Sequence, residues 1–278
     1  MSLTSRGLAV GVLLVSFASH AAAQAPPSPT GVLTDQQVEV FLKAARIVSK
    51  RGAKTGVTDS IRATLTDGRI THDAQIQTVD IARPVFQTLQ STEINFVDTY
   101  RYNIAGYRLA RMLHIEHVPV SVERPVDGKP AAVTWWIDDV MMDELGRSKR
   151  ADPTGPNQED TAKQMHVMRV FDELIQNSDR NAGNILWTKD WTMWLIDHTR
   201  AFRYFTKLQD PDRLSRCDEV LLQTMRVLTR EALAAAVGRN LGKAEIQALL
   251  ARRDLLVAHF DTKIAQNGYG AVVYSYLR

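Results

Sequence analysis

The chain has 278 residues, of which 45% are hydrophobic and 23% are charged. This is the composition of an ordinary globular protein, and it excludes a disordered chain or a membrane channel. The net charge of +3 comes from interspersed positive and negative residues. Nucleic-acid modules instead show long basic runs or basic–aromatic alternation, so we expect no nucleic-acid partner. The single cysteine, Cys217, excludes an intrachain disulfide, and without a His or Cys nearby in sequence it is predicted to be structural rather than nucleophilic.

The N-terminus has the pattern of a secretory signal. Arg6 supplies a positive charge, residues 7–18 are apolar, and Ala21–Ala23 offers small residues for cleavage before Gln24. The apolar stretch is too short to span a bilayer, although an uncleaved membrane anchor remains the alternative. We therefore expect a signal peptide at 1–23, a Pro/Ser-rich linker at 24–33, no transmembrane span after cleavage, and a periplasmic or secreted protein.

The next region, 34–145, is predicted to be β-rich with one prominent central helix, in the manner of a small N-terminal lobe. Apolar residues at helical or alternating spacing, with Asp-Gly turn signals between strands, define its elements. They are a helix at 34–50 with Thr34 or Asp35 as N-cap, a hairpin of 61–65 and 70–79 around Thr66–Gly68, a helix at 98–114 capped by Asp98, strands at 118–122 and 131–137 around Asp127–Gly128, and an acidic crossing segment at 138–144.

The rest of the chain, 146–278, is predicted to be mainly helical. A polar surface loop at 147–160 precedes a strong helix at 161–177, and a loop at 177–184 leads into a short β-pair, 185–187 and 193–196. Two or three amphipathic helices follow within 218–266. A β-rich region with one helix, followed by a helical region with a hairpin at its entrance, predicts an α+β, two-lobed kinase-like fold.

The segment 170–203 has the residues that phosphoryl transfer requires. That reaction needs a carboxylate to orient the acceptor hydroxyl, and an amide and a second carboxylate to hold the cation that bridges the phosphates. Asp179 and Asn184 lie five residues apart in one loop, and a hairpin after them would bring Asp197 back beside Asn184. Hard oxygen ligands suit Mg²⁺ or Mn²⁺. The alternative is an Asx-rich turn with a solvated Asp197.

At these residues the sequence resembles known kinases. The run 179–186 (DRNAGNIL) followed by 195–198 (LIDH) resembles the catalytic and metal-binding motifs of phosphatidylinositol 3- and 4-kinases. The run 171–180 (FDELIQNSDR) is similar to secretory-pathway kinases of the Golgi casein kinase and four-jointed type, and 104–113 with 118–120 resembles their N-lobe helix and next strand. The resemblance implies that Asp179 is the catalytic base, and that Asn184 and Asp197 are metal ligands.

The chain departs from that family where the phosphates would be held. The resemblance places Gln77 at the position of the strand lysine and Asn103 at that of the helix glutamate. A neutral Gln–Asn pair could hydrogen-bond, but it would not neutralise phosphate charge. Gly52 and Gly56 are the candidates for a phosphate loop. Three arginines are possible substitutes for the lysine or plain surface residues: Arg62, Arg69 and Arg83.

Further candidates have two interpretations each. Trp136 and Asp138 occupy the hinge position and would border an adenine pocket, or Trp136 packs at a lobe interface. His114 and His117 lack the spacing of a zinc helix and are interpreted as a helix C-terminal turn. Glu93 either binds the metal or supports a residue that does, or it is a solvated carboxylate. Arg200 would pair with a phosphate, with Asp179, or in a structural salt bridge.

The sequence therefore predicts a metal-dependent phosphotransferase. ATP or another nucleotide would donate the phosphoryl group, and the acceptor would be a hydroxyl of a protein, sugar or small molecule that the sequence does not specify. Because both charges of the Lys–Glu pair are absent, the alternative is a catalytically inactive pseudokinase that acts as a secreted binding module.

Overall fold

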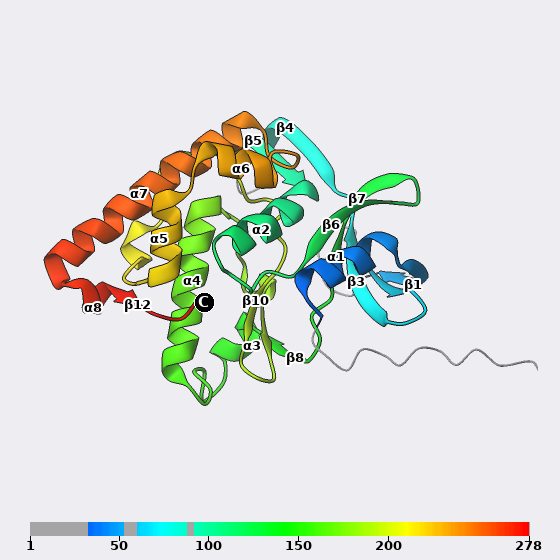
Figure 1. Ribbon diagram of the computed structural model, residues 1–278, viewed down its shortest axis with the longest axis horizontal. Helices are drawn as coiled ribbons and strands as arrows, with labels where there is room; N and C mark the ends of the chain where they lie inside the picture. The colour runs from blue at the N-terminus through cyan, green and yellow to red at the C-terminus, as the bar shows by residue number, and fades with distance from the viewer. Residues whose placement is uncertain (1–32, 53–59, 88–91, 278) are drawn as a thin grey trace, which may run out of the picture.

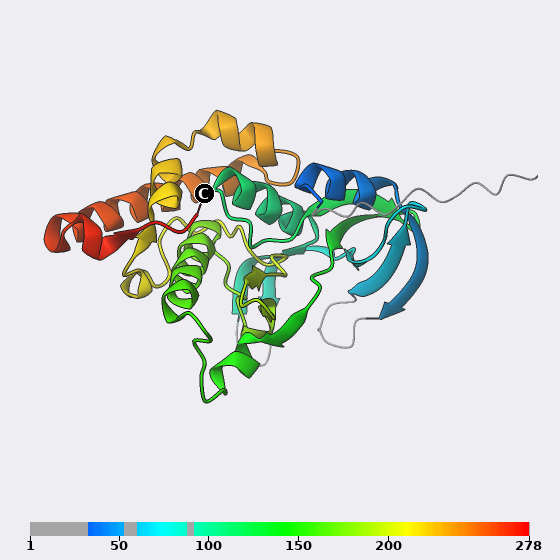
Figure 2. The same ribbon diagram turned by 60° about the horizontal axis from the view of Figure 1, so that its bottom comes forward.

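The computed structural model describes residues 33–52, 60–87 and 92–277, and it has a β-sheet part and a helical part (Figure 1). Figure 2 shows the same division from a second direction, with the first strands on one side of the central helix α2 (Arg101–Met112) and the long helix α7 (Lys243–Asn267) on the other. The predicted signal peptide, nearly all of the linker, and Gly56 lie outside the described residues.

The first part is a five-stranded antiparallel sheet in the order β1-β2-β3-β7-β6. Its strands are β1 (Arg46–Gly52), β2 (Ile61–Thr66), β3 (Thr71–Gln77), β6 (Ser121–Val126) and β7 (Lys129–Trp135). Both predicted hairpins are confirmed. Their turns contain Gly68 and Gly128 at φ +88° and +77°, where glycine has no steric cost. Helix α1 (Asp35–Ala44) packs on β6 and β7 through a buried apolar face.

The predicted helix at 34–50 is too long. Thr34 is its N-cap and forms a capping box with Gln37, as a polar N-cap favours. The helix ends at Ala44, Ala45 is extended, and Arg46–Gly52 instead pairs with β2 as the edge strand β1. Ile47 and Val48 are β-branched, so they suit a strand once a partner is present.

One further hairpin was not predicted. Strands β4 (Asp80–Gln87) and β5 (Thr92–Thr99) pair only with each other, in a ribbon that is exposed over most of its length. Asp98 lies in β5 and is therefore not a helix cap. Helix α2 (Arg101–Met112) follows Tyr100, which makes no side-chain capping bond. The ribbon has no single buried face and contains Pro84, so its sequence lacks the alternation that indicates a strand.

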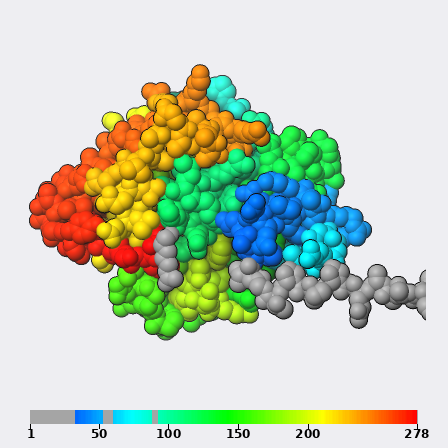
Figure 3. All heavy atoms as spheres, in the orientation of Figure 1, coloured from blue at the N-terminus to red at the C-terminus, as the bar shows by residue number. Residues whose placement is uncertain are grey.

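Helix α2 joins the two parts of the molecule. It packs on β6 and β7 on one side and on α6 (Arg230–Val237) on the other. In the space-filling view it lies between the segments of α1 and α6 (Figure 3). Most of its residues are buried, including Asn103 and Gly106. A residue on α2 can therefore contact both the sheet and the helical part of the chain.

The helical part is built around α4 (Gln158–Ile175). A three-stranded sheet in the order β10-β9-β8 lies beside α3. Helix α7 packs on α4, and α5 and α6 pack on α7. The remaining elements are β8 (Val140–Asp143), α3 (Glu144–Ser148), β9 (Ile185–Thr188), β10 (Met193–Leu195), β11 (Cys217–Asp218), α5 (Glu219–Val227), α7 (Lys243–Asn267), α8 (Tyr269–Val272) and β12 (Val273–Tyr274).

Two further predictions concern this part. Cys217 is buried in β11, and burial raises the pKa of its thiol far above the ordinary value, which fits a structural rather than a nucleophilic thiol. Among the described residues, no helix combines the length and the hydropathy that crossing a bilayer requires. The predicted α+β, two-lobed arrangement is thus the observed one, with a β-rich first part and a helical second part.

Candidate active site

The loop between α4 and β9 contains the first two candidate residues. Helix α4 ends at Gln176, whose left-handed backbone (φ 52°) turns the chain out of the helix. The Asn177 side chain then accepts the Asp179 N–H at 3.2 Å, and the Asn181 side chain accepts the Gly183 N–H at 2.9 Å. These Asx turns fix the loop locally. Asp179 is left with a side chain that is 40% exposed.

Asp179, Asn184 and Asp197 come together as the hairpin predicts. Asn184 Nδ2 donates to the carbonyl of Asp179 at 3.3 Å. On the other side, the Ile196 N–H donates to the carbonyl of Asn184 at 3.1 Å, one step beyond the Leu195–Ile185 pair of the β9–β10 ladder. Asp197 therefore lies directly beyond the residue that bonds to Asn184. The three side chains belong to one connected loop and strand end.

The electrostatics of Asp179 show that the acidic groups lie close together. Burial raises the pKa of its carboxyl, and the negative charges of Asp197 and Glu93 raise it further, while Arg200 opposes the shift. Arg200 lies 3.5 Å from the Asp179 carboxylate and 2.6 Å from Glu93. Glu93 also pairs with Arg203 at 2.6 Å. Arg200 thus forms the predicted contact with Asp179 and also ties the β5 strand to the site.

Asp197 has an unusual backbone and an open oxygen. Its φ of 53° is in the left-handed region, which Asp tolerates better than most residues. Its Oδ1 accepts from the Thr199 hydroxyl at 3.0 Å and from the Thr199 N–H at 3.4 Å. No hydrogen bond reaches Oδ2 from the part of the chain that the structure describes. That oxygen is available to a ligand.

Asp98 is a third aspartate near the site. It is only 7% exposed, and its Oδ1 has no hydrogen-bond partner in the structure. Burial raises the pKa of its carboxyl, and Asp197 and Asp179 add to that shift. Asp98 was predicted to be a helix cap, because the β4–β5 ribbon that places it beside the site was not predicted.

Arg180 holds the loop to the rest of the site. Its guanidinium donates to both carboxylate oxygens of Asp172 at 2.9 and 3.0 Å, and to the carbonyls of Asn184 and Ile196 at 3.0 and 2.6 Å. It also contacts His198 Nε2 at 3.0 Å. Because a guanidinium only donates, Nε2 accepts and the ring proton is on Nδ1. Burial holds the pKa of His198 well below its usual range, so this imidazole is neutral.

Gln77 and Asn103 form the hydrogen-bonded pair that the sequence allowed. Asn103 Nδ2 donates to Gln77 Oε1 at 2.6 Å, and both residues are buried, at 5% and 2% exposure. Asn103 Oδ1 accepts the backbone N–H of His198 at 2.7 Å. The pair therefore connects β3, through α2, to the residue that follows Asp197.

Trp136 and Asp138 lie elsewhere. They line a cavity of about 490 Å³ between the end of β7 and the β9–β10 turn, to which Asp179, Asn184 and Asp197 do not contribute. Asp138 contacts His72 Nε2 at 2.7 Å, and Trp136 lies under the Arg62 guanidinium at 4.1 Å. The structure therefore does not bring these two residues together with the acidic group.

The other candidates already have structural partners. Arg62 pairs with Asp73 at 2.6 Å, and Arg83 lies over the ring of Phe86. His117 is buried beside Tyr276, and burial lowers its pKa to about 4. Gly52 ends the edge strand β1.

Two features of the site could not be assigned from sequence. Arg180 was visible as part of the DRN run, yet nothing local indicates that it reaches Ile196 and His198. Asp98 reaches the site only through the β4–β5 ribbon, which also brings in Glu93, a residue already named as a candidate from sequence. In each case the missing information is a contact between segments far apart in the chain.

Comparisons with known proteins identify the fold. No family model matches the chain, and no curated protein sequence matches it. Among solved structures, it is similar to hydra Fam20 with sugar, with a TM-score of 0.65 at 12% identity over 86% of this chain and 92% of that one. The Golgi casein kinase with Mn/ADP bound gives a TM-score of 0.62 at 12% identity, covering 87% and 80%. The Helicobacter pylori proinflammatory kinase CtkA gives 0.51 at 12% identity, covering 81% and 98%. At these identities the likeness shows an atypical kinase-like fold.

Proposed function

We propose that this chain is a metal-dependent phosphotransferase that moves a phosphoryl group from a nucleotide such as ATP to a hydroxyl acceptor. The observation that carries the proposal is the convergence of Asp179, Asn184 and Asp197 on one loop and its paired strand end. The kinase-like fold supports it, because the similar structures include a kinase with Mn/ADP bound. Fold alone does not set the acceptor.

Asp179 is proposed to orient the acceptor hydroxyl and accept its proton. Its carboxylate is partly exposed, so an acceptor can reach it, and its raised pKa makes it a better base than an ordinary aspartate. Arg200, at 3.5 Å, holds the carboxylate in place and compensates part of its charge. The Arg180 hydrogen bonds fix the loop on which Asp179 lies.

Asn184 and Asp197 are proposed to hold Mg²⁺ or Mn²⁺. The donors are hard oxygens: Asn184 Nδ2 faces Asp179, which leaves its Oδ1 for a ligand, and Asp197 Oδ2 is open. No three His, Cys, Asp or Glu side chains converge as a metal cluster in the described ranges. The chain would therefore supply two ligands, with phosphate and water oxygens as the rest. Such an ion, when bound, neutralises charge on the phosphates.

Asp197→Asn and Asp179→Asn separate these roles, and asparagine keeps the left-handed backbone at 197 accessible. We expect Asp197→Asn to weaken metal-dependent nucleotide binding at least about tenfold. Asp179→Asn should leave binding within about threefold and lower phosphoryl transfer by about 10²–10⁴. Calorimetry with ATP and Mn²⁺, and isotope transfer to extract proteins, measure the two effects. Asp212→Asn, at an exposed position, is the matched control. Unchanged metal-dependent affinity in Asp197→Asn would refute the assignment.

A second function is favoured by the neutral pair. Because Gln77 and Asn103 are buried and bonded to each other, this part of the chain offers no lysine–glutamate pair to the phosphates. The chain would then be a pseudokinase that acts as a binding module, exported if the predicted signal at 1–23 is functional. Two results together would favour this function over the first: no isotope transfer is detected, and ATP with Mn²⁺ does not change the melting temperature.

A further inference from the structure

A second pocket lies against the catalytic loop. It has a volume of about 440 Å³ and is lined by α4, by the loop residues Ser178 and Arg180, by the start of β9, and by the segment 209–214. Asp179, Asn184 and Asp197 do not line it. Successive residues of the loop therefore face different surroundings, and the pocket is separate from the proposed catalytic centre.

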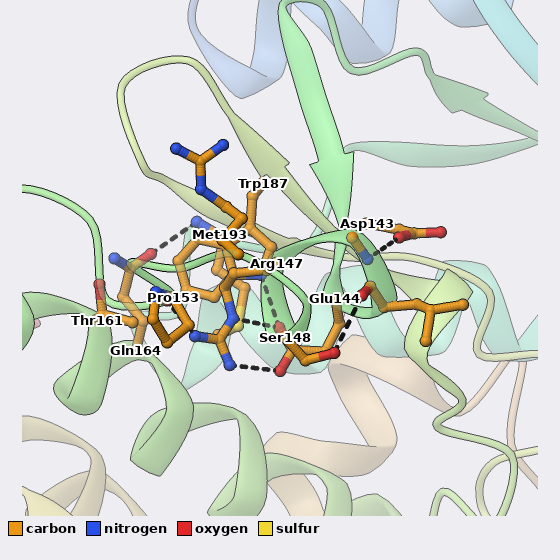
Figure 4. A network of polar contacts seen from close by, with 12 residues as sticks. Asp143, Glu144, Arg147, Ser148, Pro153, Thr161, Gln164, Trp187 and Met193 are labelled. Carbon is orange, nitrogen blue, oxygen red and sulfur yellow. Dashed lines mark hydrogen bonds and ion pairs between the residues drawn. The ribbon is translucent and has the colours of Figure 1, made fainter.

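The acidic groups around this pocket already have partners. Glu144 accepts two hydrogen bonds from Arg147 at 2.6 Å each and one from Trp187 Nε1 at 2.9 Å (Figure 4). Asp172 is held by both arms of the Arg180 fork. Glu173 is buried and accepts the backbone N–H groups of residues 209 and 210 at 2.8 Å each. These three carboxylates are satisfied within the protein.

Arg169 is the group that remains uncompensated. It projects from α4 into the pocket, and its Nε is buried without a hydrogen-bond partner. It forms no ion pair with any described residue. Burial lowers its pKa, and the nearby positive charge of Arg213 lowers it further, with only Glu144 opposing. Arg169 and Arg213 thus line one pocket, and the Arg213 side chain is 67% exposed.

Arg213 is only loosely paired. Its Nε lies 3.6 Å from the Asp210 carboxylate, and both side chains are at least half exposed. An exposed pair at that distance stabilises little, so Arg213 is available to another anion. The same pocket wall includes the apolar side chains of Met165, Met168 and Leu214.

We propose that this pocket binds a phosphomonoester, with Arg169 as the principal anchor and Arg213 as its second contact. An arginine without an ion pair among the described residues, next to one that is only loosely paired, favours an anion, and the planar guanidinium matches a phosphate bidentately. The pocket is of the size that ligand sites have and is larger than a phosphate ion, so the methionine and leucine side chains would contact the organic part of the ester. This inference does not depend on the proposed catalytic function.

Calorimetry on the full chain tests the proposal, near pH 7 and with EDTA present so that metal-dependent binding at the catalytic loop does not contribute. The probes are inorganic phosphate, glucose 6-phosphate and O-phosphoserine, with glucose as the uncharged comparison. We expect both esters to bind more tightly than phosphate, and glucose not to bind. The ester that binds with the higher affinity indicates whether the natural ligand is a phosphorylated sugar or a phosphorylated amino acid.

Three variants locate the site. Arg169→Gln should weaken phosphate-ester binding about tenfold or more, as loss of a charge-assisted hydrogen bond predicts. Arg213→Gln should weaken it by a smaller factor. Arg239→Gln, at an exposed position that lines none of these pockets, should have no effect. Circular dichroism and melting temperature confirm folding, and Arg169→Lys serves if Arg169→Gln unfolds. Any one of three results would overturn the proposal. The Arg169 and Arg213 variants could both bind the esters with wild-type affinity, Arg239→Gln could weaken binding as much as they do, or the wild-type chain could fail to bind millimolar ester.

Discussion

Two regions of the molecule hold buried polar groups in opposite ways. Between β3 and α2, Gln77 and Asn103 form a neutral pair that bonds within itself and to the backbone of His198. Between α4 and the loop that follows it, Asp172 and Arg180 form a charged, bidentate pair, and Arg180 also donates to two carbonyls. A neutral pair costs far less desolvation than an ion pair, so it needs fewer partners. The charged region retains the recognisable kinase pattern, and the neutral one does not.

The two regions meet at one residue. The backbone N–H of His198 donates to Asn103 Oδ1, and its ring Nε2 accepts a hydrogen bond from Arg180. It also lies against Gly106 of α2, because a Cβ at Gly106 would be 3.1 Å from His198 Cγ. Changes in either region therefore reach the residue adjacent to Asp197, and the following variants test how far each effect extends.

The largest effect is expected from Arg180→Gln. The side chain is 8% exposed, and its removal takes away the charged partner of the Asp172 carboxylate and one donor from each of two carbonyls. Breaking such a pair costs about 3–5 kcal/mol. Urea denaturation followed by circular dichroism measures the free energy of unfolding. The matched control is Arg226→Gln, which breaks the more exposed pair with Asp261 and should cost at most about 1 kcal/mol. Equal losses in the two variants would show that the Arg180 network stabilises the fold no more than an exposed ion pair does.

The neutral pair predicts a double-mutant cycle. Gln77→Lys alone places an unpaired ammonium group at a position 2% exposed, and we expect a loss of about 2–3 kcal/mol. Asn103→Glu in the same chain supplies the opposite charge and should recover at least about 1 kcal/mol, a coupling typical of residues in contact. The free energies of unfolding of both single variants and the double variant give the coupling. Strictly additive losses would contradict the contact between the two side chains.

The parts of the fold that were predicted from sequence are those encoded locally. The hairpins around Asp67-Gly68 and Asp127-Gly128 have turn residues that favour positive φ, and α4 has strong apolar periodicity. The strand β1 and the β4–β5 ribbon were missed for one physical reason. Their residues are mostly exposed, so no buried face imposes a pattern, and pairing with a distant or neighbouring strand decides their conformation.

The same distinction applies to the site. Asp179, Asn184 and Asp197 were found as a group because a loop and a two-stranded hairpin place them within 19 residues, counting Asp179 to Asp197 inclusively. The Gln77–Asn103 bond was anticipated from family positions rather than from local pattern. Asp98 and the full reach of Arg180 depend on contacts that no local signal specifies, and Trp136 and Asp138 proved to line a different cavity.

The smallest effect is expected where the two regions touch, from Gly106→Ala. Alanine in a helix interior gains about 1 kcal/mol over glycine, but the new methyl group would press on His198 at 3.1 Å, and overpacking costs about 1–3 kcal/mol. We expect a net loss of about 1 kcal/mol in the free energy of unfolding. Gly270→Ala isolates the contact, because a Cβ there meets nothing within 4 Å in the short helix α8. It should be neutral or slightly stabilising. If Gly106→Ala is as stable as Gly270→Ala, α2 is not closely packed on His198, and the neutral region would be joined to the charged one only by the single Asn103 hydrogen bond.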